Sequence, residues 1–170
     1  MKSTLAVTPL IFLLWAKGFS AERPNILIIF TDDQGYGDLA CYGSKKNKTP
    51  SLDQLAKQGM RFTSFYTQTV CGPSRSALLT GRQPFRSKGW SMPAEEITFA
   101  ELMRGSGYQT ACIGKWDVSN RKAIISRMPN AQGFDYFFGA LGANDGGAVR
   151  LHHNNKAAGS TKDMGELTTL

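Results

Sequence analysis

The sequence predicts an α/β layered fold in which strands alternate with helices. Residues 25–30 are Asn25 followed by an unbroken apolar run rich in β-branched side chains, which is typical of a strand buried on both faces of a parallel sheet. Residues 108–113 predict a second buried strand, and the segments between the two carry residues that start and end helices. This alternation is typical of a sheet covered by helices.

The first predicted strand is followed by two acidic residues. Pro24 precedes residues 25–30, and Thr31, Asp32 and Asp33 follow them. Open α/β sheets bind their ligands just beyond the carboxyl ends of their strands. Asp32 and Asp33 are therefore candidate site residues.

One helix is predicted before Cys71 and a second one directly after it. The first spans residues 49–59, with Thr49 as a possible cap, Pro50 in the first turn and Gly59 at the end. Residues 61–68 alternate only partly and predict a strand or an extended arm that leads into Cys71. The second helix spans residues 73–80 and is ended by Gly81.

A third helix is predicted to begin at Thr98, which has the capping-box spacing to Glu101. It runs to about Arg104 and ends at Gly105 or Gly107. The strand at 108–113 then delivers Lys115 just beyond its end. The sequence changes character at residue 133: residues 133–139 are followed by a Gly/Asn-rich stretch through residue 159, which predicts a surface excursion. Residues 166–170 resemble the start of a further helix.

The N-terminal residues have the order of a secretory signal peptide. A charged start is followed by a short apolar run over residues 5–16 and by small residues near 18–21. This run is too short for a stable membrane span, so we expect residues 1–21 to be a signal peptide and the protein to be secreted or periplasmic. A buried helix or an uncleaved anchor is the alternative.

Charge and cysteine content exclude some classes of protein. The 170 residues carry a formal net charge of +7, but the basic residues are scattered and no RNA-binding signature accompanies them, so nucleic acid is not the expected partner. A positive surface instead favours anionic substrates. The three cysteines show no zinc-ligand spacing, and Cys41 and Cys112 are either a disulfide pair or two buried thiols.

Residues 71–82 read Cys-Gly-Pro-Ser-Arg-Ser-Ala-Leu-Leu-Thr-Gly-Arg, which resembles the signature of the formylglycine-dependent type I sulfatases. The Asp32-Asp33 pair, the triplet at 114–116 and the stretch at 133–139 match the same family in order and approximate spacing. The resemblance implies an alkaline-phosphatase-like mixed or parallel sheet flanked by helices. It also implies that residues 22–170 are only the N-terminal part of a catalytic domain, which we expect to be truncated here.

The same resemblance implies a cofactor set and a mechanism. A maturation enzyme would convert Cys71 to formylglycine, whose hydrate attacks the sulfur of a sulfate ester and later releases sulfate. Arg75 would hold the hydrate, and Lys115 would contact both the hydrate and the sulfate. Asp32, Asp33 and the modified Cys71 would bind Ca²⁺, or alternatively Mg²⁺. Further metal and substrate ligands of the family are expected beyond residue 170, so we expect residues 1–170 alone not to form a competent catalyst.

Position 117 departs from the family pattern, which usually has a histidine after Gly-Lys-Trp. Asp117 is either a proton acceptor in catalysis or the partner of Arg121, four residues later. The two histidines His152 and His153 favour an exposed loop or a substrate rim over a metal site, because no carboxylate or cysteine completes a ligand set.

The sequence thus predicts a sulfuric ester hydrolase acting on sulfated glycans or aryl sulfates. One alternative is a phosphonate or phosphate ester hydrolase on the same scaffold, since both reactions require neutralisation of anionic oxygens. The other alternative is an inactive protein that binds sulfated glycans.

Overall fold

The computed structural model describes residues 23–143 and 147–163. The chain divides into two units, Met1–Gln34 and Gly35–Leu170, and each is described by itself. The expected signal peptide at 1–21 and the expected helix at 166–170 lie outside the described residues. Within the described ranges, no helix has the length and apolar character needed to cross a membrane.

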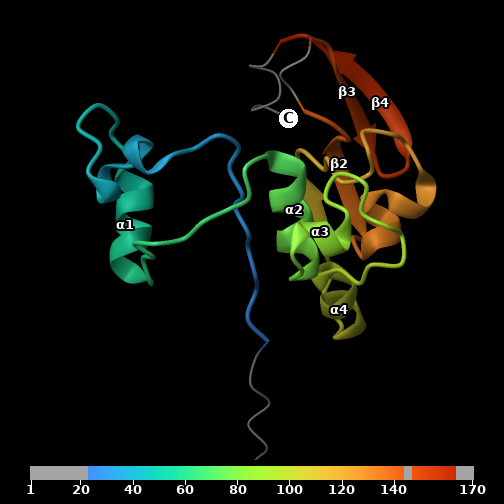
Figure 1. The fold of residues 1–170 in the computed structure, drawn as a ribbon, viewed down its shortest axis with the longest axis horizontal. Helices are drawn as coiled ribbons and strands as arrows, with labels where there is room; N and C mark the ends of the chain where they lie inside the picture. Colours follow the sequence, from blue (N-terminus) through green and yellow to red (C-terminus); the bar gives the residue numbers. More distant parts are fainter. Residues whose placement is uncertain (1–22, 144–146, 164–170) are drawn as a thin grey trace, which may run out of the picture. The chain divides into compact units, whose positions relative to one another are not determined.

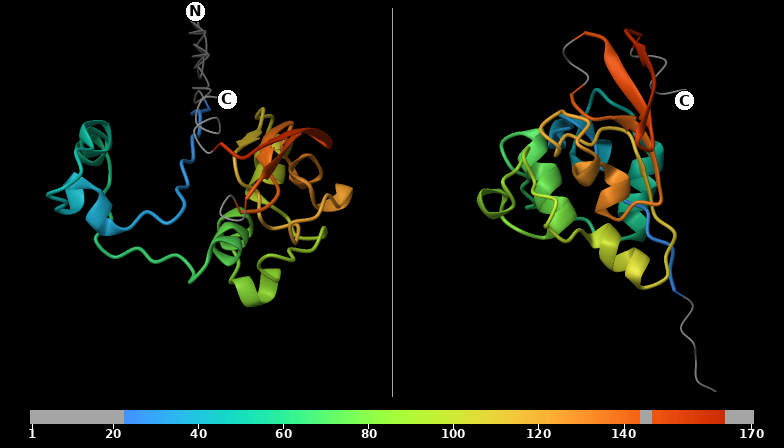
Figure 2. Two further views of the ribbon diagram at one scale, coloured as in Figure 1. Left: turned by 90° about the horizontal axis from the view of Figure 1, so that it is seen from above. Right: turned by 90° about the vertical axis from the view of Figure 1, so that its right-hand side faces the viewer.

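A four-stranded mixed sheet organises the second unit, which confirms the predicted α/β class (Figure 1). Its strands are β1 (Ala111–Ile113), β2 (Tyr136–Ala140), β3 (Val149–His153) and β4 (Lys156–Thr161), arranged in that order. β1 pairs with β2 in parallel, and the β2–β3 and β3–β4 pairs are antiparallel. The β3–β4 hairpin extends beyond the helices (Figure 2).

The expectation of a surface excursion between residues 139 and 159 was wrong, because β3 lies there and β4 begins there. Val149 and Leu151 are buried at alternate positions of β3. Gly139, just before this stretch, has a φ of 157°, and a Cβ atom at this position would lie 1.9 Å from the carbonyl oxygen of Gly114. Gly139 therefore allows a close approach of two backbone segments beside β2.

The predicted strand at residues 25–30 is also not found. These residues have no strand conformation, and Ile26, Leu27 and Ile29 are exposed. An apolar run of this kind becomes a central strand only when neighbouring strands bond to both of its edges. In the described part of the chain, the strands of the sheet bond to one another in the order β1 to β4.

The second predicted strand exists but is neither long nor buried. β1 covers three residues at the edge of the sheet, and Ile113 is 77% exposed. Residues 61–68 adopt no strand conformation, which agrees with the alternative of an extended arm.

The helices agree closely with their local signals. They are α1 (Pro50–Gln58), α2 (Cys71–Thr80), α3 (Pro84–Ser87) and α4 (Phe99–Gly105), with short 3-10 helices at Tyr36–Asp38, Ala40–Tyr42, Ile125–Arg127 and Pro129–Gln132. α1 ends at Gly59 and α2 at Gly81, as predicted. Thr98 and Glu101 form the predicted capping box of α4. The Thr49 hydroxyl does not cap α1 but donates to Asp53 at 3.0 Å.

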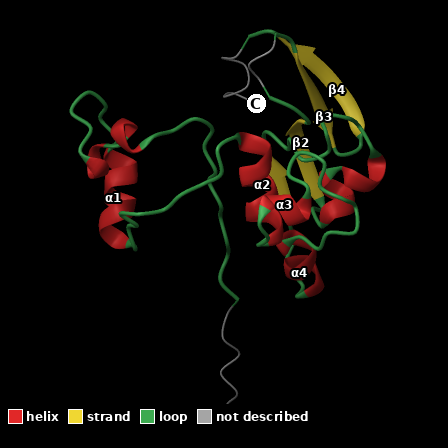
Figure 3. Ribbon diagram, in the orientation of Figure 1, coloured by secondary structure: helices red, strands yellow, loops and turns green. Residues whose placement is uncertain are grey.

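The main core lies where α2, α3 and α4 cluster beside β2 (Figure 3). Phe137 of β2 is fully buried and packs with Leu79 of α2 and Ala100 of α4. Trp116 is 2% exposed, makes an edge-to-face contact with Phe134 at 6.0 Å, and donates its Nε1–H to a backbone carbonyl at 2.9 Å. Burial of large aromatic side chains holds the segment after β1 in place.

Candidate active site

Cys71 is the first residue of α2 and is partly buried. The Ser74 hydroxyl donates to the carbonyl of Val70 at 2.9 Å and accepts from the N–H of Gln68 at 3.1 Å. These bonds tie the incoming arm to the first turn of the helix. The first N–H groups of a helix have no intrahelical partner and favour negative charge. The first turn of α2 therefore places the Cys71 side chain where an anion is stabilised.

Gly72 allows Trp90 to lie against this first turn. A Cβ atom at Gly72 would lie 1.8 Å from Cδ1 of the Trp90 indole, a separation that no side chain tolerates. Trp90 was not singled out in the sequence, because no motif marks it. Only a glycine directly after the cysteine hinted that another group approaches there.

The loop after β1 brings Lys115 and Asp117 to α2. The N–H of Gly114 bonds to the carbonyl of Phe138 at 2.9 Å, and the N–H of Trp116 bonds to that of Ala140 at 2.8 Å. The loop thereby continues the pairing of β1 with β2, while the Trp116 side chain is anchored in the core. Asp117 has a φ of 53°, a left-handed conformation that aspartate adopts more readily than most residues.

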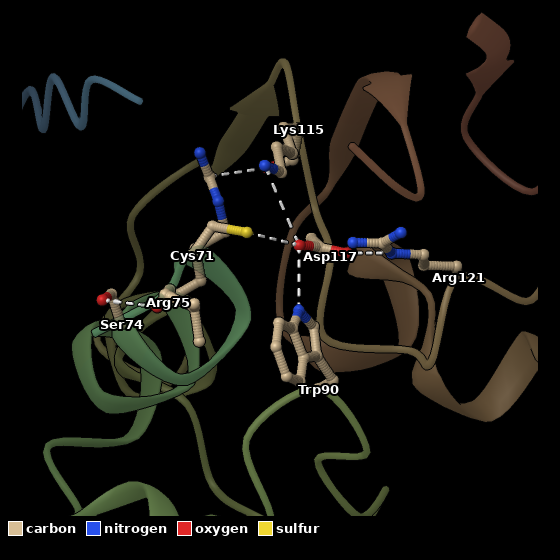
Figure 4. A network of polar contacts seen from close by, with 8 residues as sticks. Cys71, Ser74, Arg75, Trp90, Lys115, Asp117 and Arg121 are labelled. Carbon is tan, nitrogen blue, oxygen red and sulfur yellow. Dashed lines mark hydrogen bonds and ion pairs between the residues drawn. The ribbon is translucent and has the colours of Figure 1, made fainter. Parts of the chain in front are cut away.

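Asp117 is the centre of the cluster and is fully buried (Figure 4). Its Oδ2 accepts hydrogen bonds from Cys71 Sγ and from Trp90 Nε1, both at 3.1 Å. Its Oδ1 accepts one from Arg121 Nε at 3.1 Å, and Lys115 Nζ lies 3.9 Å from Oδ2. A buried carboxylate is stable only with such partners. The predicted pairing with Arg121 is confirmed, and the same carboxylate also faces Cys71.

Arg75 lies one turn after Cys71 on α2, and its Nη1 donates to the carbonyl of Lys115 at 2.8 Å. Arg75 therefore links the helix to the loop. The structure brings four of the six sequence-predicted site residues into one cluster: Cys71, Arg75, Lys115 and Asp117.

Cys112 lies behind this cluster, partly buried against the core. Burial raises the pKa of the Cys112 thiol from 9.0 to about 11, although the nearby positive charge of Arg75 acts in the opposite direction. Cys41, Cys71 and Cys112 are all free thiols, so no disulfide joins Cys41 to Cys112.

Asp32 and Asp33 belong to the unit Met1–Gln34 and are exposed there. Asp33 has a φ of 55°. Two adjacent carboxylates have the chemistry that hard cations such as Ca²⁺ prefer, but Ca²⁺ takes six to eight oxygen ligands. The described residues contain no cluster of three or more His, Cys, Asp or Glu side chains that would hold a metal. Asp32 and Asp33 therefore fit a cation as part of a ligand set.

His152 and His153 lie in β3, so the exposed loop, one of the two settings that the sequence predicted, is not found. His153 packs beside Tyr136 and Phe138, with ring centroids 5.3 and 6.4 Å away. His152 is partly buried and lines a hollow next to Arg121.

Comparison with known proteins agrees with this geometry. Residues 24–164 match the sulfatase family. The chain is 41% identical over 150 residues to human steryl-sulfatase and 44% identical over 151 residues to human arylsulfatase A. The matches cover 76% and 81% of this chain but only 26% and 29% of those proteins.

Solved structures show the same likeness. One structure, from work on the metabolism of multiple glycosaminoglycans by Bacteroides thetaiotaomicron, matches with a TM-score of 0.72 and 32% identity. The match covers 81% of this chain and 32% of that one. A second, Ps i-CgsB in complex with k-i-k-neocarrahexaose, matches with a TM-score of 0.68 and 28% identity, over 79% and 37% of the two chains.

The chain belongs to the sulfatase family. It is thus a member of a hydrolase family that includes arylsulfatases, and it spans less than a third of the length of the curated relatives named above.

Proposed function

We propose that this chain contributes the nucleophile and its surrounding charges to an enzyme that hydrolyses sulfate monoesters. The observation that carries the proposal is the cluster around Cys71: Asp117 contacts the cysteine side chain at the first turn of α2, and Lys115 lies beside Asp117. A sulfate ester bears negative charge on the group that is attacked. Cationic side chains and helix N–H groups are the means by which proteins neutralise such oxygens.

Each residue of the cluster has a definite task in this proposal. Formylglycine made from Cys71 by a maturation enzyme would supply a hydrated aldehyde as the nucleophile. Arg75 holds the hydrate, and Lys115 contacts both the hydrate and a sulfate oxygen. Asp117 lies within hydrogen-bond distance of the Cys71 side chain, so it receives the proton that the nucleophile gives up. Arg121 and Trp90 hold the Asp117 carboxylate in place.

Asp32 and Asp33 would hold Ca²⁺, or Mg²⁺, as part of a larger set of ligands. The cation would act as a Lewis acid toward a sulfate oxygen.

The proposed substrates are sulfated polysaccharides or aryl sulfates. The arylsulfatases among the relatives favour the second class, and the neocarrahexaose complex of a structural neighbour favours the first. We further propose that residues 1–21 direct the protein to a secreted or periplasmic location, where such substrates occur.

The decisive experiment is to express the chain with a formylglycine-generating enzyme and to measure the mass of the peptide that contains Cys71. We expect loss of the thiol and gain of an aldehyde, and no such change in Cys71→Ala. Hydrolysis rates of the enzyme to which this chain contributes, on an aryl sulfate and an aryl phosphonate ester, then identify the reaction, with the sulfate ester preferred. An unmodified thiol in a protein that still cleaves sulfate esters would contradict the proposal.

A further inference from the structure

A hollow of about 500 Å³ lies between the loop after β1 and the β3–β4 hairpin. Much of its surface consists of small residues, among them Gly142, Ala143, Ala157 and Gly159. A volume of this order is within the range of small-molecule sites and exceeds that of a single inorganic anion. The hollow therefore has room for a sugar residue with its substituents.

The groups with hydrogen-bond donors in this hollow are mostly basic. Arg121, Arg150 and His152 line it, and none of its described lining residues is acidic. Arg150 pairs across the hairpin with Ser160, and His152 pairs with Ala157. Because these partners are small, they leave space above the strand. Such a surface favours a planar or tetrahedral anion that accepts several hydrogen bonds.

His152 adds a second observation that points to a ligand. Its Nδ1 atom is buried, and no hydrogen-bond partner for it is found among the described residues. An unsatisfied buried polar atom costs free energy, and a ligand bound in the hollow would remove that cost.

Arg121 connects the hollow to the reacting centre. Its Nε bonds to Oδ1 of Asp117, whose Oδ2 accepts from Cys71, so a single carboxylate separates Arg121 from the nucleophile. The Arg121 side chain is 55% exposed and thus remains accessible from the hollow. An anionic group in the hollow would therefore belong to the same substrate molecule as the ester that reacts at Cys71.

We infer that this hollow, lined by Arg121, Arg150 and His152, is a subsite for a second anionic group, a sulfate or carboxylate, on a neighbouring sugar of the substrate. The inference rests on the proposed function and narrows it, because it selects polyanionic saccharides over compounds with one sulfate ester.

The test uses the chain carrying Cys71→Ala, which binds without turnover. Affinities for a disulfated disaccharide and for its monosulfated counterpart are measured by calorimetry at low ionic strength. We expect the second sulfate to strengthen binding about tenfold, the size of one charge-assisted contact. Arg150→Gln and His152→Phe should each remove most of that gain. Lys156→Gln removes a charge from the same hairpin but not from the hollow. This variant should therefore keep the gain in affinity from the second sulfate.

Equal affinity for the two disaccharides would overturn the inference, as would an equal loss of preference in Arg150→Gln and Lys156→Gln, which would indicate only general attraction. A disaccharide with a carboxylate in place of the second sulfate distinguishes the two anions. The proposed function is judged separately, by conversion of Cys71 and hydrolysis of an aryl sulfate with one anionic group. Arg150→Gln should leave that hydrolysis unchanged.

Discussion

The thiol of Cys71 donates a hydrogen bond to the fully buried carboxylate of Asp117, with 3.1 Å between Sγ and Oδ2. The two residues are 46 positions apart, so only the packing of α2 against the loop after β1 brings them together. The carboxylate is balanced by Lys115 and Arg121, which allows a negative charge to persist beside the proposed nucleophile.

Replacement of Asp117 tests its proposed role as proton acceptor. Asp117→Asn keeps the shape of the side chain but removes its basicity, so turnover of an aryl sulfate should fall about 100-fold. Asp117→His should retain more activity, because imidazole accepts a proton and histidine tolerates this backbone conformation. The exposed Glu95→Gln is the matched control and should behave as wild type. An Asn variant with full turnover and an unchanged pH profile would show that Asp117 is structural.

Trp90→Phe should separate the packing of the indole from its hydrogen bond. The phenyl ring still covers Gly72, but the bond from Nε1 to Asp117 is lost. We expect the free energy of unfolding to fall by about 1.5–3 kcal/mol, as for a bond to a charged group. Turnover should also fall, because Asp117 loses a donor that holds its carboxylate in place.

Trp116→Phe provides the comparison for this variant. It removes an indole bond to a neutral backbone carbonyl in the core. It should lower stability without a comparable fall in the turnover of the folded protein, so equal turnover in the two variants would show that Trp90 does not act on the site.

Gly72→Ala should disrupt the first turn of α2. The new methyl group would collide with the Trp90 ring, so either the ring or the helix start must move. We expect a loss of about 1–3 kcal/mol in denaturant unfolding, together with reduced conversion of Cys71. Gly105→Ala is the control, because no atom lies within 4 Å of its added Cβ. It should be neutral or slightly stabilising.

The raised pKa of the buried Cys112 thiol predicts that the folded protein loses stability at alkaline pH. This pKa is 9.0 in the unfolded chain and about 11 in the folded protein, because burial disfavours the thiolate. Between pH 9 and about pH 11, the Cys112 thiol loses its proton in the unfolded chain but keeps it in the folded protein. The stability associated with the protonated thiol is therefore complete below pH 9 and is lost as pH rises to about 11, by roughly 2–3 kcal/mol.

Urea unfolding across this pH range measures the free energy of unfolding as a function of pH. The decrease of this free energy with pH should be smaller in Cys112→Ala than in the wild-type protein. An equal decrease in the two proteins would show that other groups cause the loss of stability.

Several features of the fold follow from short stretches of sequence. The ends of α1 and α2 at Gly59 and Gly81, and the capping box of Thr98 with Glu101, depend on residues within one helical turn. Such local interactions form in the same way whatever surrounds them.

Strands are different, because each depends on neighbours that are distant in sequence. Residues 25–30 have the composition of a central strand yet form none, while the Gly/Asn-rich stretch after residue 139 forms β3 and the start of β4. Whether a segment forms a strand depends on which strand edges it can bond to in the folded chain. Amino-acid composition does not specify this pairing.

The amino-acid sequence by itself determined which residues are candidates for the site: the Cys71 motif, Arg75 and Lys115, with the ion pair of Asp117 and Arg121 as one of two roles for Asp117. All of these depend on residue type and short spacing. Tertiary structure alone decided that Trp90 covers Gly72, that Asp117 faces Cys71, and that Arg150 and His152 share a hollow with Arg121. The physical reason is that these contacts join segments from 18 to more than 40 residues apart, and their geometry is set by the packing of a common core.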